Sequence, residues 1–270
     1  MIHTDTVMQD AHGLPRGFVV LDVPAYDGAQ YYQVARNIPK LLDPSQWESL
    51  RVIAPASYSY QRFLLPLTAF IISLGQEAAF PYAFLAINVL ALLTSCWLVL
   101  RWSNGKWLYA LALALCPSAM VALHFTLAEP LVILLIVIVL TRLDRSGRMD
   151  WMTISCLMLL MLAREVSVLF AGFLLAFFLW KYQWRNAALV LPTVLVFLAW
   201  HGFLFAVFGD VPFLTSTAAK DWPGHAAFEV LIDARGYDRY TLSAVAVFLG
   251  FVVPSTIWTV SYTHLRAHET

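Results

Sequence analysis

The sequence predicts an all-α membrane protein, namely a polytopic helical bundle preceded by an extracytoplasmic first loop that carries interfacial amphipathic helices. Three observations support this fold class. Hydrophobic residues make up 60% of the 270 residues, charged residues only 13%, and the mean hydropathy is +0.71. Soluble domains carry about 45–50% apolar and about 25% charged residues. Long stretches of the chain also contain no Asp, Glu, Lys or Arg at all.

The composition excludes two other classes of protein. The chain has 17 Lys and Arg against 17 Asp and Glu, so it has no basic surplus with which to neutralise a nucleic acid. Its three cysteines are too few for the disulfide framework of a small secreted scaffold.

The charge-free stretches define a transmembrane bundle over 82–260. A spanning helix needs about 20 apolar residues. The segments 82–100, 107–125, 187–208 and 242–260 meet this length alone. The segments 130–141, 151–163 and 166–180 are shorter and need tilt or local thinning of the bilayer. Together they predict about seven membrane segments, several of them short.

Basic residues set the expected orientation, because Lys and Arg concentrate in cytoplasmic loops. They flank three short connections and comprise Arg101 and Lys106, then Arg142, Arg145 and Arg148, then Lys181 and Arg185. If all three connections are cytoplasmic, the linkers 124–129, 163–166 and 210–240 face outside. This requires 151–180 to break at Arg164-Glu165, because one helix of that length would extend about 45 Å, longer than the hydrocarbon core requires.

The region 1–81 is expected to be the extracytoplasmic loop. In residues 1–62, short amphipathic pieces are separated by Pro24, Pro39, Pro44 and Pro55. The apolar segment 63–74 is too short to span and is interpreted as an interfacial helix on the outer leaflet. Since no basic and apolar leader precedes it, we expect the chain to be a fragment. Residues 261–270 are interpreted as a non-native tail.

On the same outer face lies Asp27, next to Gly28 and among Tyr26, Tyr31 and Tyr32. Glycine permits a backbone turn close to a ligand, and tyrosine rings can stack on a sugar. Asp27 is then a candidate for polar-ligand chemistry. Equally, Asp27 can be the N-cap of an amphipathic helix.

Three further positions on that face carry charge. Arg62, in a tyrosine-rich segment, can pair bidentately with a phosphate, or can anchor the chain at the interface with its tyrosines. Glu129, before Pro130, suits a helix N-terminus but is also a candidate at a membrane boundary. Arg164 and Glu165 interrupt an apolar run, where each charge costs about 2.5–3.5 kcal/mol at the bilayer centre, so each needs a partner elsewhere.

Other polar residues carry less signal. Cys96, Cys116 and Cys156 lie in apolar segments without metal-ligand spacing and are interpreted as small core residues. His201 is more often a packed histidine than a ligand. No metal or other cofactor is predicted, although a divalent metal is left open.

The order of these motifs resembles the GT-C superfamily of polytopic glycosyltransferases, which use polyprenyl-phosphate sugars. It is most similar to bacterial membrane proteins with a YDGxxYYxxA loop, a YxYQRxxxP segment, and EP and RE turns. These motifs stand here at 26–35, 58–66, 128–130 and 163–165. The resemblance covers about residues 20–210, and the chain lacks the first span, the distal helices and the C-terminal donor-binding part of that superfamily.

The resemblance implies transfer of a sugar from a polyprenyl-phosphate donor to an extracytoplasmic acceptor with inversion at the bacterial inner membrane. Asp27 would be the general base, and Arg62 and Arg164 would face the leaving phosphate. Glu129 and Glu165 would position the acceptor or an arginine, and the tyrosines would bind substrate. The alternatives are a flippase for lipid-linked intermediates and a non-catalytic membrane protein of the same fold.

Overall fold

The computed structural model describes residues 27–51, 56–116, 119–120, 122–123 and 126–210. Every regular element in these ranges is a helix, which confirms the all-α prediction, and no strand occurs in them. The chain divides into two compact units, 1–215 and 216–270, and all described residues belong to the first. The predicted segment 242–260, the linker beyond 210 and the tail 261–270 lie outside the described residues.

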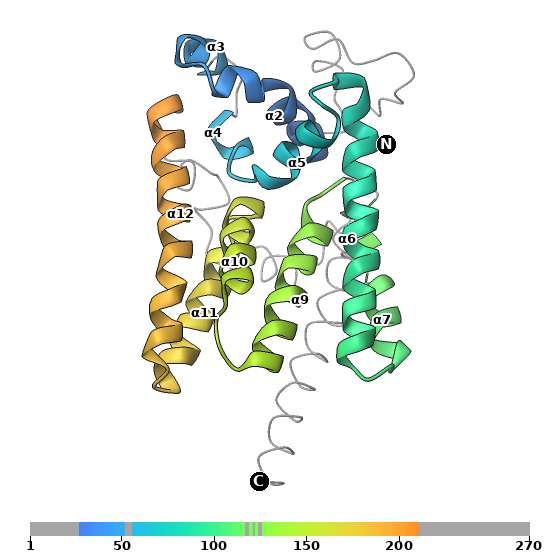
Figure 1. Ribbon diagram of the computed structural model, residues 1–270. Coiled ribbons are helices and arrows are strands. Elements are labelled where there is room, and N and C mark those ends of the chain that lie inside the picture. The colour runs from blue at the N-terminus through green and yellow to red at the C-terminus, as the bar shows by residue number, and fades with distance from the viewer. Residues whose placement is uncertain (1–26, 52–55, 117–118, 121, 124–125, 211–270) are drawn as a thin grey trace, which may run out of the picture. The chain divides into compact units, whose positions relative to one another are not determined.

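Short helices form the N-terminal part of the unit. They are α2 (Asp27–Leu41), the 3₁₀ turn η1 (Pro44–Gln46), α3 (Trp47–Arg51), α4 (Ala56–Ser59), α5 (Leu64–Ile72) and the 3₁₀ turn η2 (Glu77–Ala79). Asp43 caps η1 by accepting from the Ser45 backbone N–H at 3.0 Å, so Asp-Pro starts this turn. We call α2–α5 the N-terminal layer (Figure 1).

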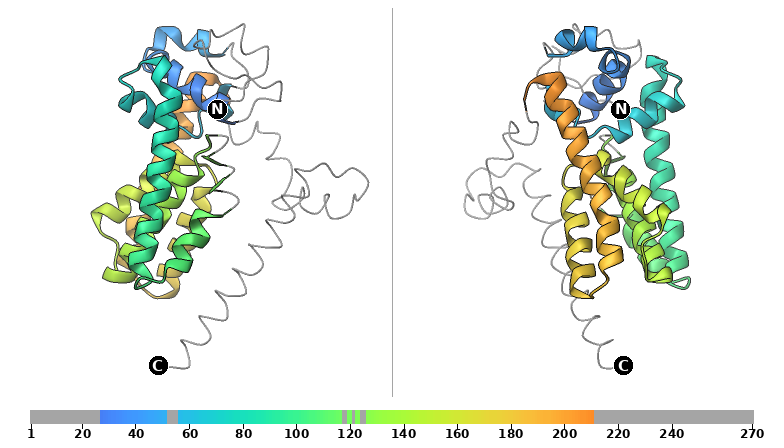
Figure 2. Two further views of the ribbon diagram at one scale, coloured as in Figure 1. Left: turned by 90° about the vertical axis from the view of Figure 1, so that its right-hand side faces the viewer. Right: turned by 60° about the vertical axis from the view of Figure 1, so that its left-hand side comes forward.

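Six apolar helices follow. They are α6 (Phe80–Trp102), α7 (Trp107–Ala114), α9 (Glu129–Ser146), α10 (Trp151–Ala163), α11 (Ser167–Trp180) and α12 (Trp184–Phe208). Successive helices run up and down, and α11 and α12 lie side by side (Figure 2). Gly147 ends α9 at φ +64°, a left-handed conformation that glycine adopts readily, and Asp150 then caps α10 through the Thr153 N–H.

The three basic connections meet at one end of the bundle, as the orientation argument requires. The Trp102 indole N–H donates to Asp144 Oδ2 at 2.9 Å, which joins the ends of α6 and α9. The Met149 backbone N–H donates to Asn186 Oδ1 at 3.0 Å, which joins the α9–α10 connection to the start of α12. We call residues 101–106, 142–150 and 181–185 the basic end.

The N-terminal layer packs at the other end, which we call the layer end. The Arg51 Nε–H donates to the carbonyl oxygen of Val207 at 2.7 Å. The Trp200 indole N–H donates to the carbonyl oxygen of Tyr60 at 3.1 Å, and the Phe63 and Trp200 rings are in contact. The last two turns of α12 therefore hold the layer in place.

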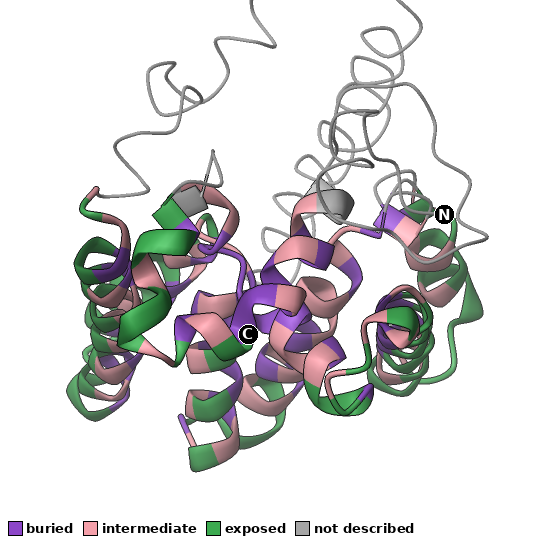
Figure 3. Cartoon of the chain, turned by 90° about the horizontal axis from the view of Figure 1, so that it is seen from above, coloured by how far each residue is buried: buried purple, intermediate pink, exposed green. Residues whose placement is uncertain are grey.

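The core lies between the helices, and the outer faces of the bundle are largely apolar. Leu157, Leu160 and Met161 of α10 are fully buried against α9, α11 and α12. Seen from the layer end, buried residues gather inside the bundle and exposed residues outside it (Figure 3). Within the described residues, only 77–102 and 184–208 are long and apolar enough to cross a membrane.

One predicted membrane span is wrong. The segment 107–125 was expected to be a single helix, but α7 ends at Ala114 and the chain leaves the helix at Leu115 and Cys116. The cause is Pro117 in the sequence. Proline disfavours helical geometry in the preceding residue and supplies no N–H to the turn before it.

Substitution of the fully buried Leu160 tests the packing of α10 in the core. We expect Leu160→Ala to lower the free energy of unfolding by about 2–5 kcal/mol, because its side chain leaves a cavity between four helices. Thermal unfolding in detergent measures the effect. Leu159→Ala is the matched control, because its side chain is 41% exposed on the same helix. Equal effects of the two substitutions would contradict the assignment of the inner face of α10.

Candidate functional site

The predicted break between α10 and α11 is confirmed and forms the centre of the candidate site. Arg164 ends α10 in an extended conformation, with φ −160° and ψ 136°, and α11 begins three residues later at Ser167. The Ser167 backbone N–H donates to the Arg164 carbonyl at 3.1 Å, which closes a tight turn. Because the backbone turns between them, Arg164 and Glu165 can reach different partners.

Glu165 pairs with Arg62 of the N-terminal layer. The Arg62 Nε–H donates to Glu165 Oε2 at 3.0 Å, and its Nη2 donates to Glu165 Oε1 at 2.9 Å. The same Nη2 donates to the Tyr58 hydroxyl at 2.7 Å. The two charged side chains are only 8% and 12% exposed. A bidentate pair with a phosphate was one of the two expectations for Arg62, and in the structure the Glu165 carboxylate, 103 residues along the chain, forms the bidentate pair.

Arg164 pairs with Glu129, the first residue of α9. The helix dipole favours a carboxylate at this position, and Pro130 completes the first turn. Their side chains are 28% and 21% exposed. Two atoms of this pair, Arg164 Nε and Glu129 Oε2, are buried without a hydrogen-bond partner.

Each glutamate thus pairs with an arginine in the structure. The two pairs cross: neighbours in sequence on α10–α11 bind residues on two different elements. They bring together three of the four sequence motifs at the layer end. Burial raises the pKa of Glu165, but the hydrogen bonds and charge of Arg62 outweigh it, so that the pKa lies below its ordinary value.

The tyrosines of α2 face the protein interior. Tyr31 and Tyr32 are each 2% exposed and pack with Leu65, Ala69 and Phe80. The Tyr32 and Phe80 rings meet edge to face with centroids 5.8 Å apart. Stacking of these tyrosines on a sugar is thus a wrong expectation, because α2 turns that side toward the core. The Tyr32 hydroxyl is nevertheless buried without a partner, and burial raises its pKa.

The Asp27 motif is described only in its backbone. Asp27 is the first residue of α2, and Gly28 is helical, so the expected turn at Gly28 is replaced by the first turn of a helix. The helix of the alternative expectation is therefore present, but Asp27 is its first helical residue, and the capping role expected of its side chain is not tested. The Asp27 side chain and Tyr26 lie outside the described part of the structure, and Asp27 remains a candidate by sequence alone.

Sequence reasoning missed several polar residues around Arg62. Tyr60 is buried, and burial raises its pKa to about 12 despite a hydrogen bond with Asn37. Gln61 is 1% exposed, and neither atom of its amide has a partner. The Ser59 hydroxyl donates to Gln30 Oε1 at 3.1 Å. Their only sequence signal was position in the motif, since burial of a polar side chain depends on tertiary packing.

Two residues were judged correctly as structural. His201 is buried in α12, and its Nδ1 lies 3.0 Å from the Phe197 carbonyl oxygen. Its ring contacts the Phe197 ring at 4.1 Å between centroids, as expected for a packed histidine. Cys156 is likewise buried in the core. Among the described residues, no three His, Cys, Asp or Glu side chains come together as a metal site.

Comparisons with known proteins found no match for this chain among family models, curated proteins or solved structures.

Glu165 provides a test of the site that combines mutation and pH. At neutral pH, Glu165→Gln should lower the free energy of unfolding by about 3–5 kcal/mol, because it leaves the buried Arg62 charge uncompensated. The depressed pKa means that this stabilisation is complete above the ordinary value of 4.5 and is lost as the pH falls through the lower folded-state pKa. The difference between wild type and variant should therefore shrink in acid.

The measurement is the free energy of unfolding of both proteins, solubilised in detergent, at a series of pH values from neutral to acidic. Glu48→Gln is the control, because Glu48 forms an exposed pair with Arg51 and should change stability little. A stability difference for Glu165→Gln that does not vary with pH would show that the carboxylate charge is not what holds Arg62.

Proposed function

We propose that the chain is a multi-pass membrane protein in which α6, α7 and α9–α12 lie in the bilayer. The outer faces of these helices support this. On α11, Leu169, Phe173 and Phe177 are exposed along one stripe. On α12, Leu191, Leu195 and Leu198 are exposed. Exposed apolar faces that run along whole helices are unfavourable in water and typical of lipid contact.

The basic end is proposed to face the cytoplasm and the layer end the outside of a bacterial inner membrane. Besides its basic residues, the basic end carries a set of exposed aromatics, namely Trp102, Trp107, Trp151, Trp180, Tyr182 and Trp184. Trp and Tyr gather where a membrane meets water, and Lys and Arg gather on the cytoplasmic side. In this orientation the N-terminal layer is the predicted extracytoplasmic loop.

For activity, we propose sugar transfer from a polyprenyl-phosphate donor to an extracytoplasmic acceptor. One observation carries this proposal: the YSYQR, EP and RE motifs converge on two crossed ion pairs at the layer end. Membrane charges without function are rare because each one is costly to insert. A lipid-linked donor would also reach this end from the outer leaflet.

The reaction requires a base and a charge partner. The acceptor oxygen attacks the anomeric carbon, its proton passes to the Asp27 carboxylate, and the bond from the anomeric carbon to the phosphate oxygen breaks with inversion. Polyprenyl phosphate leaves with an additional negative charge, so a nearby guanidinium stabilises the transition state.

The two arginines differ in fitness for that role. Arg62 donates hydrogen bonds from Nε and Nη2 to Glu165 and Tyr58, so it is best suited to fix the layer onto the bundle. Arg164 keeps its Nε–H without an acceptor and is the more exposed of the two. We therefore assign the contact with the leaving phosphate to Arg164, with Glu129 orienting it.

A non-catalytic membrane protein is the second candidate. The buried Arg62–Glu165 ion pair favours it, because an ion pair with a purely structural role would have the same geometry. A flippase is less well supported. It would need charged groups through the depth of the bilayer, whereas the charged pairs of the described bundle lie at its two ends.

Asp27→Asn tests the transfer proposal. We expect it to reduce transfer of radiolabelled sugar from polyprenyl-phosphate donors in membranes by about a hundredfold or more, as loss of a general base does. Membrane insertion and expression should not change. Asp144→Asn is the control, because the same chemical change falls at the basic end, where Asp144 accepts from Trp102.

Full transfer by Asp27→Asn would contradict the catalytic assignment. No transfer by the wild-type protein with any donor tested, together with preserved folding, would favour the non-catalytic candidate.

A further inference from the structure

The basic end carries far more positive charge than its own acidic residues can balance. Residues 101–106, 142–150 and 181–185 contain seven Lys or Arg and two acidic residues, Asp144 and Asp150. The chain as a whole has no net charge. The excess of five positive charges is therefore a local feature of this end.

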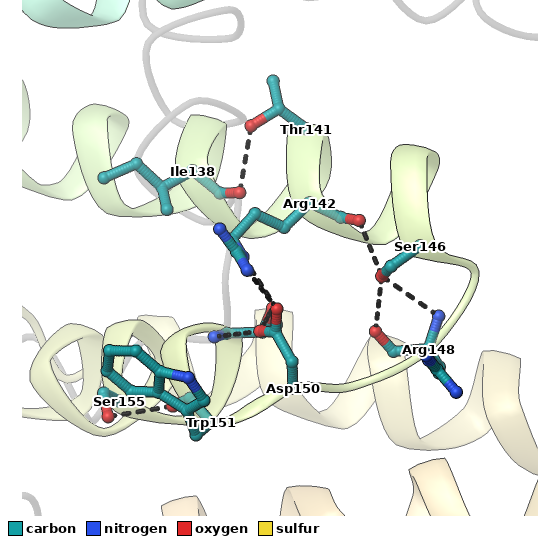
Figure 4. Close-up of polar contacts among 9 residues, drawn as sticks. Ile138, Thr141, Arg142, Ser146, Arg148, Asp150, Trp151 and Ser155 are labelled. Carbon is teal, nitrogen blue, oxygen red and sulfur yellow. Dashed lines mark hydrogen bonds and ion pairs between the residues drawn. The ribbon is translucent and has the colours of Figure 1, made fainter.

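Both acidic residues already have partners. Asp150 accepts from the Arg142 guanidinium and from the backbone N–H and hydroxyl of Thr153 at 2.8 and 2.7 Å. Asp144 accepts from the Trp102 indole. Figure 4 shows the Arg142 side chain turned toward Asp150, whereas the Arg148 side chain points away from it. Arg142 is thus the basic residue that this end uses internally.

Six of the seven cations are exposed and form no ion pair with a described residue. Arg101 and Lys181 lie over indole rings. The four that contact neither a carboxylate nor a ring among the described residues are Lys106, Arg145, Arg148 and Arg185. They come from all three connections, which the Trp102–Asp144 and Met149–Asn186 hydrogen bonds hold together. A surface that approaches from this end would meet all four at once.

The neighbouring aromatics indicate what that surface is. Trp107 and Trp151 each begin a helix directly after a basic connection, Trp184 begins α12 within the third connection, and all three are exposed. The Arg101 guanidinium and the Lys181 ammonium lie 5.1 and 5.2 Å from the ring centroids of Trp97 and Trp180. Indoles between cations and apolar helix faces match the order of headgroup, interface and acyl chain in a bilayer.

From this arrangement we propose that the basic end binds the phosphates of anionic phospholipids, with Lys106, Arg145, Arg148 and Arg185 as the contacts. The inference shares the membrane embedding of the proposed function but not the transfer reaction. A soluble acidic protein or a nucleic acid is the less suitable occupant, because the exposed indoles would have to stay in water beside it. Each cation near an anionic membrane surface strengthens binding about fivefold.

The experiment measures lipid selectivity directly. The purified protein is reconstituted in nanodiscs of phosphatidylglycerol and phosphatidylcholine, and native mass spectrometry counts the lipids retained on release. We expect enrichment of phosphatidylglycerol in the wild type, a loss of about fivefold for each Lys→Gln or Arg→Gln change at the four positions, and weakening by salt. Lys40→Gln at the layer end is the matched control.

Charge-preserving variants separate binding from folding. Lys106→Arg together with Arg145→Lys should keep the enrichment, and Asp27→Asn should keep it even if sugar transfer is lost. Single substitutions report the effect should a variant that combines all four Gln changes fail to fold. Equal enrichment in wild type and in folded neutral variants, or the same loss with Lys40→Gln, would overturn the proposal.

Discussion

Two crossed ion pairs at the α10–α11 break hold the layer end together, and the rest of the candidate site depends on them. Placing two guanidinium groups and two carboxylates in a largely buried position is costly unless each charge is paired. The pairing joins three separate segments, because Arg62 comes from the N-terminal layer, Glu129 from α9, and Arg164-Glu165 from the turn after α10. Removing any one partner leaves an opposite charge buried, so the four residues constrain one another.

This constraint divides the work between the two arginines. Arg62, held by Glu165 and Tyr58, fixes the layer onto the bundle. Arg164 and Glu129 keep one unsatisfied polar atom each and are the part of the cluster able to take a ligand oxygen. Buried polar atoms without partners are costly in a finished core and are more easily explained at a binding position. The zero net charge of the chain conceals this specialised end and a strongly basic opposite end.

The features that the sequence predicted correctly are those that depend on residues close together along the chain. The break at Arg164-Glu165 followed from helix length and the cost of charge in an apolar run, and the common side of the basic loops followed from alternation along the chain. What failed depends on tertiary partners. Nothing near Arg62 in the sequence indicates Glu165, and Tyr31 and Tyr32 look available until α2 packs against Phe80. The prediction of one span over 107–125 was wrong because it relied on the length of the apolar stretch, and Pro117 interrupts the helix within that stretch.

The most direct test of the account is the sidedness of the two ends. In a background where Cys96, Cys116 and Cys156 are alanine, Glu48→Cys at the layer end and Arg145→Cys at the basic end are both exposed. They are treated in intact cells with a maleimide that cannot cross the membrane. The account predicts labelling of Glu48→Cys in intact cells and of Arg145→Cys only after the membrane is opened. Labelling of both from the same side, or in the reverse order, would contradict it.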